Sequence, residues 1–204
     1  MFRFATVCLA FGLLAAPTFA AETLTFEPDH TSVVFQYPHF GMSHPSGKIM
    51  GATGTLVLDK DDPAKSTVDI TLDVKTLTTA LPDFDTLLKG EKYFDIAHFP
   101  TATFKSTKVE LTGENTANVT GDLTLHGVTH PVTLAVTFNG GYPGLAGYDP
   151  NARIGFSAKG TLKRSQFGMG YGIPAPGTTM GVEDEVDFTI ETEMTGPALK
   201  TPEK

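Results

Sequence analysis

The sequence predicts an all-β fold in which antiparallel strands close into a barrel or pack as two sheets, with one short helix. Three observations lead to this fold class. Apolar and polar residues alternate over most of the chain, threonine accounts for 30 of 204 residues, and 35 Gly and Pro residues separate nearly every alternating stretch. Threonine is typical of strands, and Gly and Pro are typical of turns. Each strand is apolar on one face only, so the apolar faces must meet inside the domain.

The first twenty residues have the composition of an export signal. A positive start with Arg3 precedes an apolar run over 5–16, and residues 18–20 form a small-x-small cleavage site. The run is too short to cross a bilayer, which takes about 20 residues. We therefore expect cleavage after Ala20, which would remove the only cysteine, Cys8.

The predicted export signal divides the chain into three parts. Residues 1–20 are the signal, residues 21–195 form one β-barrel domain, and residues 196–204, with two prolines, form a flexible tail. No stretch after residue 21 resembles a transmembrane span. We expect the cleaved protein in the bacterial periplasm, or secreted.

Alternation with a period of two identifies the strands. Val68, Ile70 and Leu72 alternate with Asp69 and Thr71, which is the pattern of a strand with one solvated face. The same reasoning, with some changes of register, predicts strands over residues 24–26, 33–37, 48–58, 68–74, 101–111, 119–125, 132–138, 154–162 and 186–194.

Two local features modify this pattern. Phe104 and Val109 have opposite parity, which predicts a bulge or a bend between them. The segment from Pro82 to Gly90 begins with proline, has acids in its first turn and Lys89 in its last, and is typical of a short helix. Eight or more strands in sequential hairpins favour an up-and-down barrel.

Charge and motifs argue against several functions. A net charge of −8 is unfavourable for nucleic-acid binding. Ser157 lacks the strand-to-helix turn of a nucleophile elbow, and the glycine-rich run 168–172 has no helix after it. The histidine pairs 39/44 and 126/130 lack a third metal ligand. We expect a binding protein without catalytic residues, metal or cofactor.

Several short segments resemble, in the right order, motifs of the YceI-like family. They are DHTSVVF (29–35), HFGM (39–42), YFD (93–95), FPTATF (99–104), GDLTLHGVTHPV (121–132) and KRSQFGM (163–169). The resemblance implies an extended, lipocalin-like barrel of eight antiparallel strands that holds a polyisoprenoid, such as a polyprenyl phosphate or a quinone tail, or another long-chain amphiphile. The family is periplasmic or secreted and commonly dimeric, which leaves a homodimer open.

Five phenylalanines are the predicted lipid-contacting residues of the inner wall. They are Phe35, Phe104, Phe138, Phe156 and Phe188. A barrel of about eight strands has room for one slender ligand, and each buried CH₂ group contributes about 0.8 kcal/mol. The alternative is that these side chains fill a solid core without a ligand.

Four further residues are candidates for contact with the lipid head group. They are His39, Asp95, Arg164 and Tyr171, which lie at strand ends or in loops that match the family segments. Arg164 could pair with a phosphate, and His39 could hydrogen-bond a quinone oxygen. Alternatively, Arg164 bridges Asp95 or another carboxylate. The resemblance implies an acid or asparagine at position 166, where this chain has the neutral Gln166, which cannot form a charge pair with Arg164.

Three functions follow as hypotheses. The first is a lipid carrier or storage protein without catalysis. The second is an enzyme or redox partner that acts on an isoprenoid quinone, with His39 or Arg164 at the reacting end. The third is a ligand-free, stress-related structural barrel.

Overall fold

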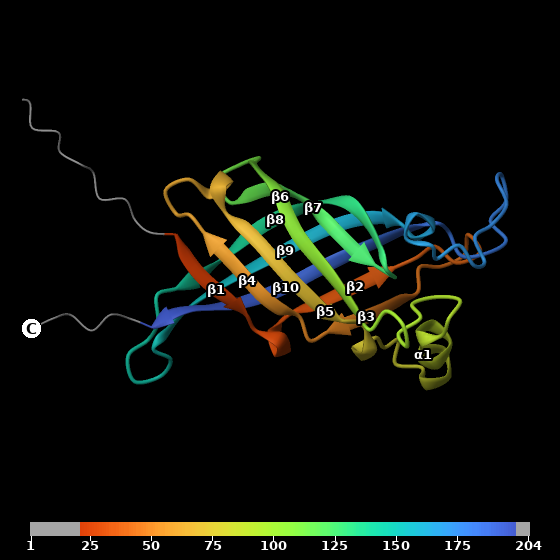
Figure 1. Ribbon diagram of the computed structural model, residues 1–204, viewed down its shortest axis with the longest axis horizontal. Helices are drawn as coiled ribbons and strands as arrows, with labels where there is room; N and C mark the ends of the chain where they lie inside the picture. The colour runs from red at the N-terminus through yellow and green to blue at the C-terminus, as the bar shows by residue number, and fades with distance from the viewer. Residues whose placement is uncertain (1–20, 199–204) are drawn as a thin grey trace, which may run out of the picture.

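In the computed structural model, which describes residues 21–198, the alternating stretches fold as ten strands and one α-helix (Figure 1). The strands are β1 (Glu22–Phe26), β2 (Ser32–Gln36), β3 (Ser46–Met50), β4 (Thr53–Leu58), β5 (Thr67–Asp73), β6 (Thr101–Leu111), β7 (Thr116–Leu125), β8 (Val128–Tyr142), β9 (Asn151–Lys163) and β10 (Glu185–Ala198). The helix is α1 (Pro82–Lys89), and the 3-10 helices are η1 (Pro28–His30), η2 (Pro63–Lys65), η3 (Val74–Thr76) and η4 (Arg164–Phe167). The expected signal, 1–20, and the end of the expected tail, 199–204, lie outside the described residues.

The ten strands form a closed antiparallel barrel with eight strand positions, as predicted. The order is β1-β4-β5-β6-β7-β8-β9-β10, and β10 pairs back with β1. β1 and β2 share one position, separated by η1, because β10 pairs with β2 at Phe188 and with β1 at Met194. β3 and β4 share the next position. The predicted strand over 48–58 is interrupted there at Gly51, whose φ of 76° suits glycine and bends the chain.

The barrel has two distinct ends. Figure 1 shows α1 and the long loop after η4 at one end, and both ends of the described chain at the other. We call the first the α1 end, defined by α1 and the loop over residues 168–184. β10 continues to Ala198, three residues beyond the predicted end of the domain.

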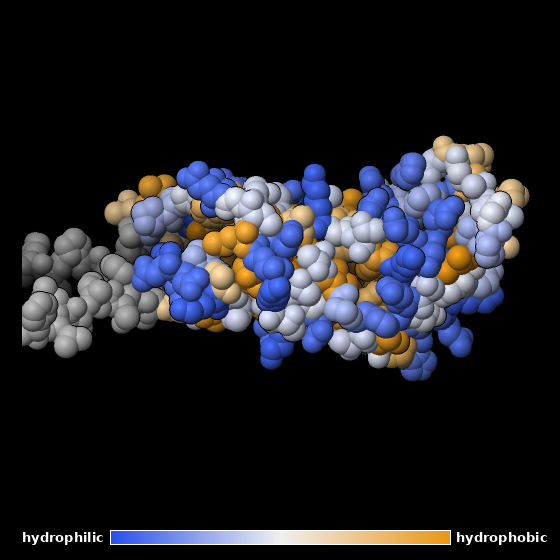
Figure 2. Space-filling model, turned by 90° about the horizontal axis from the view of Figure 1, so that it is seen from above, coloured by the Kyte–Doolittle hydropathy of each residue, from blue (hydrophilic) through white to orange (hydrophobic). Residues whose placement is uncertain are grey.

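The strand register places the predicted apolar parities on the inner face. The predicted bulge in β6 is confirmed, because the β6–β7 register shifts between Ser106 and Lys108. Both Phe104 and Val109 therefore face the interior despite their opposite parity. Threonine and charged side chains occupy the outer face, where blue and white residues cover most of the surface in Figure 2 and orange ones show between them.

The interior is hollow rather than solidly packed. Buried apolar residues form three separate clusters, around Phe35 and Leu88, around Leu24 and Met194, and around Phe167. Many inward-facing side chains on the strands between them are only half-buried, because they border open space. The alternative of a solid core is therefore wrong.

The predicted helix is confirmed as α1, and Asp85 attaches it to the barrel. The Asp85 carboxylate accepts hydrogen bonds from the Thr79 hydroxyl and backbone N–H, both at 2.6 Å, and from the Thr78 hydroxyl at 2.8 Å. Thr78 in turn exchanges two backbone hydrogen bonds with Lys48 of β3. The hydrogen bonds to Asp85, above all that from the Thr79 hydroxyl, hold the pKa of this carboxyl below its ordinary value.

Protonation of Asp85 is expected to loosen this attachment. Because the folded-state pKa lies below the unfolded value of about 3.9, the carboxylate stabilises the fold above that pH, and this contribution is lost as the pH falls through the folded-state pKa. Hydrogen-exchange protection of the Thr79 and Asp85 amides should fall in acid. In Asp85→Asn it should already be low at neutral pH. Asp83→Asn, which removes an exposed charge from the same helical turn, is the control; equal protection in both variants would contradict this role.

Candidate functional site

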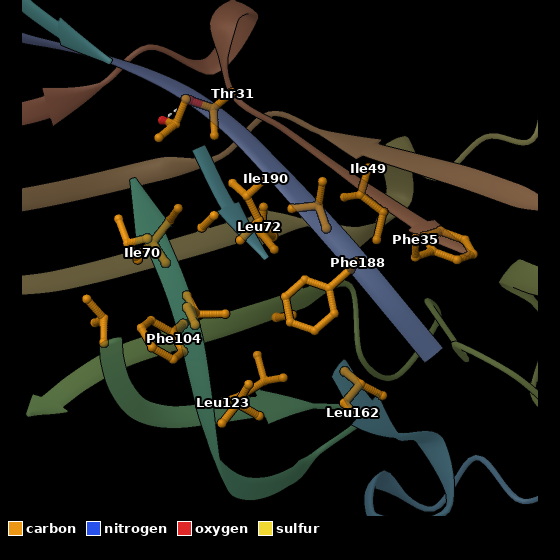
Figure 3. Close-up of a pocket in the computed structure, with 18 of the residues that line it drawn as sticks. Thr31, Phe35, Ile49, Ile70, Leu72, Phe104, Leu123, Leu162, Phe188 and Ile190 are labelled. Carbon is orange, nitrogen blue, oxygen red and sulfur yellow. Dashed lines mark hydrogen bonds between the residues drawn. The ribbon is translucent and has the colours of Figure 1, made fainter. Parts of the chain in front are cut away.

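A cavity of about 970 Å³ runs along the inside of the barrel and is lined by residues from all ten strands. Figure 3 shows apolar side chains from different strands pointing toward one another across it: Phe35, Ile49, Ile70, Leu72, Phe104, Leu123, Leu162, Phe188 and Ile190. Its volume is at the upper end of the range of about 300–1,000 Å³ that is usual for small-molecule sites. The cavity can accommodate a long, apolar molecule.

All five predicted phenylalanines line this cavity. Phe35, Phe104 and Phe188 are on β2, β6 and β10, while Phe138 and Phe156 face each other on β8 and β9 with ring centroids 5.4 Å apart. Phe138 is 39% exposed and lies at the edge of the cavity. The wall positions are as expected, whereas contact with a lipid stays a prediction.

Three of these rings cover glycines of neighbouring strands. A Cβ atom built at Gly160 would lie 2.5 Å from Cζ of Phe188, and one at Gly47 would lie 2.3 Å from Cζ of Phe35. Phe104 also covers Gly121 at 2.5 Å, where a Cβ atom would meet the Lys105 carbonyl oxygen at the same distance. Since real Cβ atoms do not approach other atoms so closely, any larger residue at these positions would displace the ring. The glycines therefore let the rings lie against the wall and leave the cavity open.

Arg164 is buried at the α1 end and is held by main-chain carbonyls. Only 7% of the residue is exposed, although it lines the cavity. Nε donates to Glu183 O at 3.0 Å, Nη1 donates to Met169 O and Tyr171 O at 2.8 Å, and Nη2 donates to Val182 O at 2.7 Å. The side chain thus joins the two limbs of the 168–184 loop.

The alternative in which Arg164 bridges Asp95 or another carboxylate is wrong. Asp95 contacts Nδ1 of His98 at 2.9 and 3.0 Å instead. Within residues 21–198, the salt bridges that involve arginine belong to Arg153. Burial lowers the pKa of Arg164, and Asp184 nearby opposes this effect. The groups that hydrogen-bond the Arg164 guanidinium are therefore neutral carbonyls, while Asp184 lies nearby without forming a salt bridge to it.

The structure brings two of the four head-group candidates to the cavity. His39 lines it and is joined to Val182 by a β-bridge, so it lies near Arg164. Tyr171 is 52% exposed and is not in the cavity wall; its ring packs against that of Tyr93 at 5.5 Å and lies beneath Nζ of Lys92. Asp95 is also outside the wall.

Sequence reasoning missed two tyrosines that line the cavity at this end, Tyr37 and Tyr93. Tyr37 has the same parity as Val33 and Phe35, so the alternation of β2 could have identified it. Tyr93 lies in a loop where no periodicity indicates which side chains face inward. Burial, and to a lesser extent each residue's tyrosine neighbour, raises the pKa of both phenols, while Arg164 partly opposes this for Tyr93. Both hydroxyls therefore remain protonated at neutral pH.

His126 and His130 both contact Phe167, His126 through the Phe167 carbonyl and His130 through the Phe167 ring. His126 Nδ1 hydrogen-bonds the Phe167 carbonyl at 3.1 Å, and the His130 ring meets the Phe167 ring edge-on at 5.5 Å. Among the described residues, no three His, Cys, Asp or Glu side chains are grouped closely enough to hold a metal ion. In that part of the chain, no helix has the length and apolar character needed to cross a membrane.

Comparisons with known proteins agree with this architecture. A family model described as YceI-like domain matches residues 24–194. A UPF0312 protein of Pseudomonas syringae pv. tomato is 37% identical over 197 residues, which cover 94% of this chain and 97% of that protein. Among solved structures, BcnA of Burkholderia cenocepacia has a TM-score of 0.70 at 23% identity and covers 82% of this chain and 98% of its own. A polyisoprenoid binding domain from Saccharophagus degradans, implicated in plant cell wall breakdown, has a TM-score of 0.61 at 12% identity and covers 85% and 98%.

Proposed function

The chain belongs to the YceI-like family, and from this premise we propose that it is a lipid-binding protein that holds one long-chain amphiphile inside its barrel. The observation that carries the proposal is the apolar cavity of about 970 Å³. The lipid class that we propose is a polyisoprenoid, either a polyprenyl phosphate or an isoprenoid quinone. The structural neighbour described as a polyisoprenoid binding domain supports this choice.

Hydrocarbon burial is sufficient to account for such binding. Each CH₂ group taken from water contributes about 0.8 kcal/mol, so two five-carbon isoprene units contribute several kcal/mol before the entropy lost on ordering the chain is subtracted. The wall needs no charged contact to retain the tail. The head group then determines which lipid is preferred.

We propose that the protein carries or stores this lipid in the periplasm and does not catalyse a reaction. The export signal predicted over residues 1–20 supports this location. Arg164 is one of two candidates to act on a quinone head group. It donates hydrogen bonds to four carbonyls instead, which favours a structural over a catalytic role.

Organic extraction of the protein purified from its native periplasm, followed by mass spectrometry, tests the proposal. We expect about one long-chain lipid per barrel. Ile190→Gln, which places an amide in the cavity wall, should lose most of this lipid. Thr189→Gln, at the adjacent outward-facing position of β10, should retain it. Protein that contains no lipid and does not bind an added polyisoprenoid would rule the function out.

A further inference from the structure

We propose that the hydroxyls of Tyr37 and Tyr93, beside the Arg164 guanidinium, hydrogen-bond an oxygen atom of the lipid head group at the α1 end of the cavity. This inference rests on the proposed function and specifies the chemistry of the ligand. The head group would be a hydrogen-bond acceptor, either a carbonyl or a phosphate oxygen.

Tyr37 is a buried residue whose hydroxyl has no protein partner. The residue is 7% exposed and lines the cavity. Among the described residues, the one tyrosine hydroxyl hydrogen-bonded within the protein is that of Tyr142. Within residues 21–198, the one enclosed polar side-chain atom without a partner is Nε2 of His126. The Tyr37 hydroxyl is not enclosed and therefore reaches open space, which is the cavity that its residue lines.

Tyr93 places a second free hydroxyl in the same region. It is partly buried, packs against the cluster that contains Tyr37 and lines the cavity. It is close enough to both Tyr37 and Arg164 to change their pKa values. Two phenols and one guanidinium thus meet at the same end of an otherwise apolar wall.

All three groups are donors, which determines the chemistry of the partner. The phenols are protonated at neutral pH, and a guanidinium has no acceptor. Four carbonyls occupy four of the five Arg164 N–H groups, and within residues 21–198 its positive charge forms no salt bridge. When a hydrocarbon chain fills the cavity, these hydroxyls lose their access to water, and a donor without an acceptor is then unfavourable, so a ligand oxygen would complete the site.

The other polar groups of the cavity wall do not make an equivalent site. The Thr31 and Thr192 hydroxyls hydrogen-bond each other at 2.8 Å, as the dashed line in Figure 3 shows. At the opposite end, Lys60 is paired with Glu22, and its side chain is solvent-exposed. The tyrosine hydroxyls that line the cavity without a protein partner therefore lie at the α1 end.

Binding of three probes that share a branched C20 chain tests this site. The probes are a quinone with a geranylgeranyl tail, geranylgeranyl monophosphate and the hydrocarbon phytane, each measured against delipidated protein. Tyr37→Phe/Tyr93→Phe removes both hydroxyls and keeps the rings. It should weaken quinone binding about tenfold, or phosphate binding by more than that, because hydrogen bonds to charged acceptors are stronger. Phytane binding should not change, and Tyr171→Phe, whose hydroxyl is outside the cavity wall, should leave all three affinities unchanged.

Each outcome has a defined meaning. A selective loss for the quinone identifies a carbonyl head group, and a selective loss for the phosphate identifies an anionic one. Equal losses for all three probes, or no loss, would overturn the head-group site while leaving lipid binding intact. If wild-type protein binds none of the probes, the proposed function fails and this inference fails with it.

Discussion

Gly160→Ala is expected to reduce lipid content at least tenfold while the barrel remains folded. The new methyl group would lie 2.5 Å from Cζ of Phe188, and the ring must leave the wall. The free side of the ring is the cavity, so the ring would occupy the space of the hydrocarbon chain. Overpacking of this kind costs about 1–3 kcal/mol, which a domain of this size can tolerate. Lipid per barrel by extraction and unfolding by circular dichroism would measure the two effects separately.

Two further variants establish the cause. Gly155→Ala adds the same methyl group on β9 but meets no atom closer than the Thr192 carbonyl oxygen at 3.6 Å, so it should keep its lipid. Gly160→Ala/Phe188→Leu replaces the displaced ring with a shorter side chain and should recover binding. Full lipid content in Gly160→Ala, or failure of the double variant to recover it, would contradict the steric explanation.

Arg164→Ala is expected to cause the largest loss of stability, about 3–5 kcal/mol, since it removes a buried charged donor from four carbonyls. For a domain of this size, that loss lowers Tm by roughly 6–20 °C. The two limbs of the 168–184 loop should also separate, which hydrogen exchange at Met169 and Val182 would detect. Urea or thermal unfolding measures the stability.

Lys163→Ala is the matched control for Arg164→Ala. Lys163 is the preceding residue and is exposed, so its loss should change stability by less than about 0.5 kcal/mol. Arg164→Lys keeps the charge but has three donors on one nitrogen and cannot reach all four carbonyls, so it should be intermediate. Equal stability of Arg164→Ala and Lys163→Ala would show that the carbonyl contacts do not hold the loop.

The alternation of apolar and polar residues predicted most of the fold, because each strand has one solvated face. That property is local and can be read from neighbouring residues in the sequence. The same parity placed Phe104 and Phe188 on the inner wall. The interruption of the 48–58 strand at Gly51 was not predictable, because it depends on how distant strands close the barrel. β8 also continues to Tyr142, into the 139–150 segment, whose Gly and Pro residues are typical of a turn, and β9 begins at Asn151, directly after that segment.

The head-group end was harder to predict for a different reason. Side-chain types suggested that Arg164 pairs with a carboxylate, but its partners are backbone carbonyls, which every residue has and no sequence pattern identifies. Asp95 pairs with His98 three residues along the chain, in a tight turn where Asp95 itself has a φ of 43°. Tyr93 belongs to the same irregular segment, so only the folded chain reveals that it faces the cavity.

The width of the cavity depends on glycines that lie beneath the phenylalanine rings, on the strand next to the one that carries each ring. Phe35 and Phe188 form part of the cavity wall, yet Gly47 and Gly160 determine how far each ring extends into the cavity. The width of the cavity can thus change by a single methyl group without any change in the aromatic residues of the wall. A relative with alanine or valine at these two positions would have a narrower bore, suited to a thinner chain, behind an identical aromatic wall.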